Sequence, residues 1–337
     1  MTQTLDDLSL ILIYSAMGVY ALAFIAFTLD LARRSSTVKK AVVAEVPVAV
    51  GAGGVGAAGS GASGAGAGDA DSSLLSLEGR DSSGRRSLAL RLGVVFTVLA
   101  FVIQLVAVVL RGIAAARVPW ANMYEFSITG TVLIVAVFLV LLLREDLRFL
   151  GTFVTGLVLV LLGVSTINYY VAISPLPPAL QSAWLVIHVL VAILGTAFFA
   201  LGGALSIVQL LQTKGDAMGR LGSALRLRFL RTLPDADTLE RLAYRVNIVG
   251  FVFWTFTLIA GAIWAERAWG RYWGWDTKEV WTFIIWTIYA GYIHARATRG
   301  WRGSRSAWLA IVGFAAVLFN FGVVNVFFKG LHAYSGL

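Results

Sequence analysis

Long apolar segments recur along the chain and are separated by short polar stretches. A helix needs about 20 mainly apolar residues to cross the ~30 Å hydrocarbon layer of a bilayer. Eight segments approach that length: 8–31, 92–110, 123–143, 149–168, 183–211, 246–265, 280–295 and 307–328. The seventh is short, and we expect its helix to begin near Thr277. The pattern predicts an all-α polytopic membrane protein with about eight transmembrane helices.

The distribution of charge gives an orientation. Charged residues make up only 13% of the chain, and most of the 27 lysines and arginines lie in alternate loops between the apolar segments. Positively charged loops stay on the cytoplasmic side of a membrane. This predicts that both termini lie on the non-cytoplasmic side. It also explains the net charge of +9 without a nucleic-acid partner. The first apolar segment is too long for a signal peptide and is followed by Arg33 and Arg34, so we interpret it as a transmembrane helix.

Composition divides the chain into three predicted parts. Residues 1–35 form the first transmembrane helix. Residues 36–88 include a tract, 48–68, that is nearly all glycine, alanine, serine and valine, and we expect a disordered cytoplasmic loop there because such a tract loses much backbone entropy on folding. Residues 89–337 form a seven-helix membrane domain. The chain has no cysteine, so any thiol in its chemistry belongs to another molecule.

Aromatic residues concentrate in the predicted outer loop, 266–281. Tryptophan is common at membrane interfaces, but there it is scattered over many helix ends. Here four tryptophans lie close together, at Trp269, Trp273, Trp275 and Trp281. Indole rings offer flat apolar faces to a porphyrin, and Arg271 or Lys278 would pair with its propionates. For Asp276 and Glu279 we favour a structural role, because their spacing fits a helix capping box.

The three histidines fall at two depths. His188 lies just inside the outer end of its segment, and His332 lies just beyond the outer end of the last one. Two imidazoles on opposite faces of a porphyrin make a six-coordinate haem. His294 follows Asp276 by 18 residues, about 27 Å along a helix, so it cannot share that iron. The alternative for each histidine is an ordinary polar residue near a membrane interface.

Four ordered motifs resemble one known family. Residues 269–281 match the signature of the WWD haem-handling superfamily. Three further segments resemble motifs of one family in that superfamily, the CcsA family, also called ResC. Residues 119–125 resemble its Pro-x-x-Asn-x-Tyr-Glu motif, residues 180–189 its first outer-histidine segment, and residues 331–334 its second outer-histidine motif. Alanine stands at 333 where the family usually has serine. The resemblance covers residues 90–337 and the first apolar segment.

The resemblance implies a role in System II cytochrome c biogenesis, in the bacterial cytoplasmic membrane. It implies that His188 and His332 ligate haem b over the tryptophan loop, and that His294 supplies one ligand of a second haem site whose other ligand comes from a ResB-like membrane subunit. The two subunits together would act as a synthase that presents haem to the Cys-x-x-Cys-His segment of apocytochrome c. A thiol-reducing protein would act upstream.

Two other functions stay open at this stage. One is a haem exporter or carrier without synthase activity. The other is a b-type electron-transfer membrane cytochrome, which normally pairs histidines at matching depth within one chain, whereas His294 has no such mate in this sequence. Glu125 is a weak candidate for proton transfer, and we favour a structural role for it.

Overall fold

The computed structural model describes residues 2–44, 87–176, 180–224, 230, 233–298, 300–328 and 330–332. Helix α1 (Thr2–Ala44) continues past the predicted boundary at residue 35, and α3 begins at Leu88. The rest of the predicted glycine-rich loop, from residue 45 to residue 86, lies outside the described residues. The proposed division into three parts therefore stays a prediction.

Every regular element assigned to the described residues is helical, which confirms the all-α class. After α1 and α3 (Leu88–Ala115) the chain forms α4 (Met123–Leu142), the 3-10 turn η1 (Arg148–Leu150), α5 (Gly151–Asn168), α6 (Ala183–Ala224), α7 (Ala236–Trp269), α8 (Thr277–Ala297), α9 (Ser304–Phe319), the π-helical turn η4 (Asn320–Val324) and α10 (Asn325–Phe327). Within the described ranges, seven helical stretches are long and apolar enough to cross a membrane. The protein is a multi-pass membrane protein.

Helix α8 corresponds to the seventh predicted span but is not among the seven stretches found in the structure. It is 21 residues long, and its sequence includes Lys278, Glu279, His294 and Arg296 together with several tryptophans and tyrosines. These residues lower its hydropathy although its length would suffice to cross the hydrocarbon layer. Length and hydropathy together thus identify seven of the eight predicted spans.

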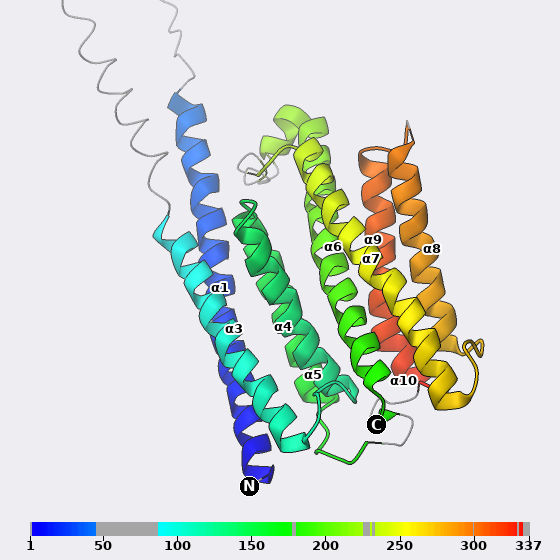
Figure 1. Ribbon diagram of the computed structural model, residues 1–337. Helices are drawn as coiled ribbons and strands as arrows, with labels where there is room; N and C mark the ends of the chain where they lie inside the picture. Colours follow the sequence, from blue (N-terminus) through cyan, green and yellow to red (C-terminus); the bar gives the residue numbers. More distant parts are fainter. Residues whose placement is uncertain are drawn as a thin grey trace, which may run out of the picture.

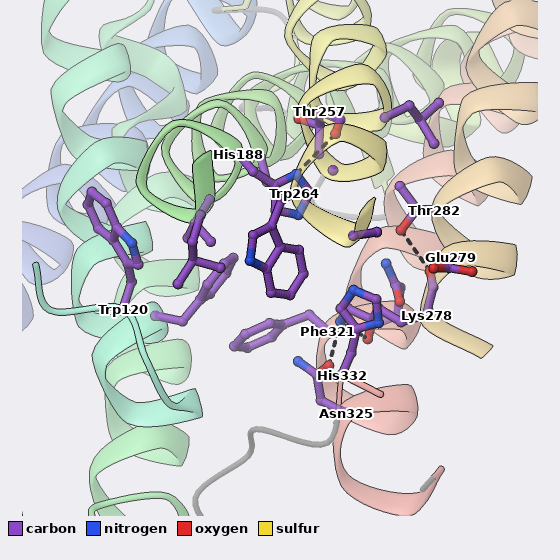
Figure 2. A pocket seen from close by; sticks show the side chains of 18 of the residues that line it. Trp120, His188, Thr257, Trp264, Lys278, Glu279, Thr282, Phe321, Asn325 and His332 are labelled. Atoms are coloured by element: carbon purple, nitrogen blue, oxygen red, sulfur yellow. Dashed lines mark hydrogen bonds between the residues drawn. The ribbon is translucent and has the colours of Figure 1, made fainter. Parts of the chain in front are cut away.

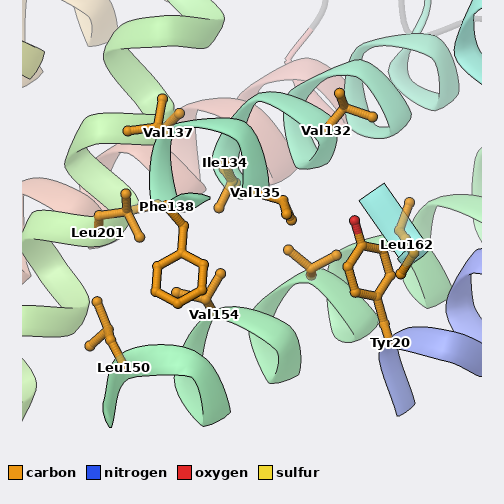
Figure 3. Packing of buried hydrophobic residues seen from close by; sticks show 14 of the residues in the cluster. Tyr20, Val132, Ile134, Val135, Val137, Phe138, Leu150, Val154, Leu162 and Leu201 are labelled. Atoms are coloured by element: carbon orange, nitrogen blue, oxygen red, sulfur yellow. The ribbon is translucent and has the colours of Figure 1, made fainter. Parts of the chain in front are cut away.

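The long helices run side by side as a bundle, with α1 and α3 at one flank and α8 and α9 at the other (Figure 1). The loop between α7 and α8, the start of α1 and the end of α10 lie at the same end of the bundle. We call this end, which contains residues 269–276, the tryptophan end. A buried cluster packs α4 against α1, α5 and α6; Phe138 lies beside Val154, Leu150 and Leu201 (Figure 3).

A buried ion-pair network joins α1, α3 and α4 at the tryptophan end. Arg111, whose side chain is fully buried, pairs with Asp6 and donates to Glu125 at 3.2 Å, and Arg117 pairs with the same Glu125 at 2.5 Å. Glu125 also accepts from the backbone N–H of Ala121 at 3.0 Å. The network fixes the segment between α3 and α4, so Glu125 has the structural role that we favoured. The predicted apolar segment ended at residue 110, whereas α3 continues to Ala115, so Arg111 lies inside the helix.

Candidate functional site

A large cavity opens at the tryptophan end, among α4, α6, α7, α8 and the turn that follows α9 (Figure 2). It has a volume of about 200 Å³ and is partly open to the outside. Aromatic and aliphatic side chains form most of its wall, including Trp120, Phe126, Trp254, Trp264, Trp273 and Phe321. His188 and His332 both line it. The tertiary structure therefore brings His188 and His332 into one mainly apolar cavity.

His188 is held by helix α7. Its Nδ1 atom lies 3.0 Å from the main-chain oxygen of Thr257, and its ring stacks on Trp264 with centroids 5.8 Å apart. A carbonyl oxygen only accepts, so Nδ1 is the protonated nitrogen and Nε2 keeps its lone pair. Gly261 makes this approach of α6 and α7 possible, because a Cβ atom there would lie 2.7 Å from Cε1 of His188.

His332 is held by the loop before α8. Its Nδ1 atom lies 2.8 Å from Oδ2 of Asp276, and the backbone N–H of Leu331 donates to Oδ1 of the same carboxylate at 3.0 Å. The imidazole edge contacts Trp264 and Trp269, with centroid distances of 5.5 Å and 4.9 Å. The hydrogen bond from His332 lowers the pKa of Asp276 below its usual value, and partial burial opposes this. Carboxylates orient metal-ligating histidines in this way.

The capping box is present as predicted. Asp276 is the N-cap of α8 and accepts from the N–H of Lys278, while Glu279 accepts from the N–H groups of Asp276 and Gly274 at 3.0 Å and 2.8 Å. Asp276 therefore has two roles, since it begins α8 and also positions His332. The local spacing indicated the first role. The second depends on a residue 56 positions away.

The four loop tryptophans have different surroundings. Trp273 lines the cavity. Trp269 does not line it but packs against two residues that do, Trp264 and His332. Trp281 packs against Phe319 of α9 with centroids 4.4 Å apart. Trp275 is 78% exposed and has a positive φ of 58°. Within the cavity, Trp264 is the indole that contacts both histidines. Sequence reasoning missed it because it lies in α7, among apolar residues that look like any buried helix.

The structure also separates the two predicted cations. Lys278 lines the cavity, whereas Arg271 is exposed and its guanidinium lies against Gly274. His294 is exposed in the last turn of α8, at the opposite end of that helix from Lys278. It does not line the cavity, in agreement with the depth expected from the sequence.

Residues 120–332 match the family described as Cytochrome C assembly protein. The cytochrome c biogenesis protein CcsA of Guillardia theta is 35% identical over 256 residues, which are 72% of this chain and 84% of that protein. CcsA of Parasynechococcus marenigrum (strain WH8102) is 40% identical over 178 residues, 48% of this chain and 58% of that relative's length. The solved structure of cytochrome c heme lyase CcmF is similar in fold, with a TM-score of 0.58 and 16% identity, over 95% of this chain and about half of that chain, 46%.

Fold and cavity define a multi-pass helical membrane protein with two histidines facing one aromatic pocket. With the matched region covering more than half of its length, the chain belongs to the CcsA family of cytochrome c assembly proteins.

Proposed function

We propose that this chain handles haem during cytochrome c assembly, as the haem-binding subunit of a System II cytochrome c synthase. Haem b is the transported substrate, and it binds in the cavity with His188 and His332 on opposite faces of the porphyrin. The observation that supports this most directly is which ring nitrogen of each imidazole is hydrogen-bonded. Each Nδ1 atom is engaged by an oxygen acceptor, Thr257 or Asp276, so each Nε2 atom remains available to iron.

The chain's contribution to the reaction is positioning. In thioether formation, each thiol of a Cys-x-x-Cys-His segment adds its sulfur to one carbon of a vinyl group and its hydrogen to the other. Both thiols come from apocytochrome c, which agrees with the absence of cysteine here. A porphyrin fixed by two axial ligands and aromatic walls presents its vinyl groups in a defined place, and such orientation accelerates a reaction between two molecules. A ResB-like subunit and an upstream thiol reductant complete the proposed system.

The proposed orientation follows from the positive charge in alternate loops. The tryptophan end faces the non-cytoplasmic side of a bacterial cytoplasmic membrane, so that the loop 266–281 and both termini lie outside. Apocytochrome c would then meet the haem on the side of the membrane where cytochromes c fold.

The absorption spectrum of the purified chain, loaded with haem, tests the binding site. We expect a six-coordinate low-spin spectrum of the bis-imidazole type, with a pyridine haemochrome that identifies haem b. A five-coordinate high-spin spectrum, or no retained haem, would contradict the proposed coordination, because two Nε2 atoms facing one iron must fill both axial positions.

His294 is proposed as one ligand of a second haem site, closer to the opposite end of the bundle. Its side chain is exposed on α8, where an imidazole from the ResB-like subunit would supply the opposite ligand. Alanine at this position is expected to lower the haem that copurifies with the two-subunit complex, with partial recovery when imidazole is added. Unchanged haem content would leave His294 as an interfacial polar residue.

A further inference from the structure

Three polar residues form one wall of the histidine cavity. Lys278 of α8 donates from its Nζ atom to the main-chain oxygen of Asn320, at 2.9 Å, and to Oδ1 of Asn325, at 2.5 Å. All three residues line the cavity. Figure 2 shows Lys278 and Asn325 on the side of His332, opposite Trp120. The amino group of Lys278 thus lies inside a cavity whose other walls are mainly apolar.

The turn after α9 makes this wall possible. Residues 320–324 form a π-helical turn, a rare element that often occurs at functional sites. The wider turn places Asn320 and Asn325 on the same side of the chain, where both reach the ammonium group of Lys278. An α-helix would turn these two residues, five positions apart, to different faces.

The hydrogen-bonding capacity of this wall is not filled. An ammonium has three donors, and Lys278 uses two of them on neutral oxygens. Asn325 donates from Nδ2 to the sulfur of Met123, which is a weak acceptor. The side chain of Asn320 is 4% exposed, and its Oδ1 atom has no hydrogen-bond partner among the described residues. The groups on this wall that can still bind an acceptor are therefore the third hydrogen of the Lys278 ammonium and the second hydrogen of the Asn325 amide.

The charge on this wall is also unbalanced. No carboxylate within the described residues forms an ion pair with Lys278; the nearby Asp276 bonds to His332, and Glu279 bonds to backbone N–H groups of the loop. Burial disfavours the charged form of Lys278, and the attraction of Asp276 only partly offsets this, so an anion that entered the cavity would be favoured at this wall.

We propose that Lys278, Asn320 and Asn325 form a carboxylate-binding subsite, which takes a propionate of the porphyrin held between His188 and His332. This inference rests on the proposed function and extends it. Lys278 provides the charge, and the Nδ2 groups of the two amides provide N–H donors. A propionate anchored here turns the other half of the porphyrin toward the wall that contains Trp120.

Titration of the full chain with iron protoporphyrin IX and with its dimethyl ester tests the subsite, because the ester keeps the ring and the iron but lacks the charged carboxylates. We expect the wild-type chain to bind the free acid at least about tenfold more tightly than the ester, as a charge-assisted hydrogen bond implies. In Lys278→Met the two affinities become equal, through loss of affinity for the free acid alone. Asn325→Leu, which keeps the charge, reduces the preference in part.

Lys214→Met is the matched control, because it removes the same charge from an exposed position on α6. It should leave the preference unchanged. Binding of the ester with a bis-imidazole spectrum reports that each variant is folded. If Lys278→Met weakens both porphyrins equally, or leaves the preference intact, the carboxylate subsite is refuted while the two-histidine site stands. If the wild type binds neither porphyrin, the proposed function fails and this inference fails with it.

Discussion

Replacing either His188 or His332 by alanine is expected to abolish covalent haem attachment when this chain is coexpressed with a ResB-like subunit and an apocytochrome c. The two histidines come from α6 and from the segment after α10, yet both line the same cavity and contact the same indole, Trp264. Each alanine variant removes one of the two proposed axial ligands, so the porphyrin loses the orientation that the reaction with two thiols requires. Holocytochrome yield measured by haem staining is the readout.

Imidazole added to the growth medium should restore part of the yield, because a free ring fits the space that the deleted side chain leaves. Tyr14→Ala, at an exposed position on α1, is the control and should give the wild-type yield. Wild-type yield in both histidine variants would contradict the two-histidine site itself. Haem binding without any attachment in the wild type would instead favour a carrier over a synthase.

Arg111→Met should lower the free energy of unfolding by about 3–5 kcal/mol, the usual cost of breaking a buried ion pair by removing one partner. Arg111 is fully buried and stands between Asp6 and Glu125, and it also donates to the main-chain oxygen of Val171 at 2.7 Å. Methionine leaves both carboxylates without this partner, although Arg117 still pairs with Glu125. Unfolding of the detergent-solubilised chain, followed by tryptophan fluorescence, measures the change.

The same substitution at Arg148 is the matched control. Its ion pair with Asp146 at 2.5 Å is partly exposed, with 27% of the arginine side chain and 67% of the aspartate side chain accessible, and pairs at the surface contribute about 0–1 kcal/mol. Adding Asp6→Asn and Glu125→Gln to Arg111→Met should recover part of the loss, since no buried charge is then left unpaired. Equal stability of Arg111→Met and the wild-type chain would show that the network does not hold α1, α3 and α4 together.

The helices were predictable because the signals that specify them are local. A long stretch of apolar residues forms a helix in lipid, because every backbone N–H and C=O group there must be hydrogen-bonded within the segment. The capping box at Asp276 and Glu279 was predictable for the same reason, since its members lie three residues apart. Hydropathy fails to identify helix α8 as a span. Its polar residues include Lys278, which lines the cavity, and His294, which is exposed, and they lower the mean hydropathy of the helix.

The two-histidine site was predictable only in outline. Counting residues from the ends of the apolar segments put His188 and His332 on one side of the membrane, and the resemblance of the motifs to the CcsA family pointed to haem. The surroundings of the tryptophans did not follow from their clustering. Trp275 is mostly exposed, whereas Trp264, which lies outside the loop, contacts both imidazoles.

What the sequence alone determined is the set of long apolar helices and the local cap that begins α8. The tertiary structure decided which nitrogen of each histidine is hydrogen-bonded, because the acceptors lie 69 and 56 positions away, at Thr257 and Asp276. It also decided that Lys278 and not Arg271 enters the cavity. Such choices depend on how α6, α7 and the turn after α9 pack together, and packing between distant segments leaves no periodic pattern in the sequence.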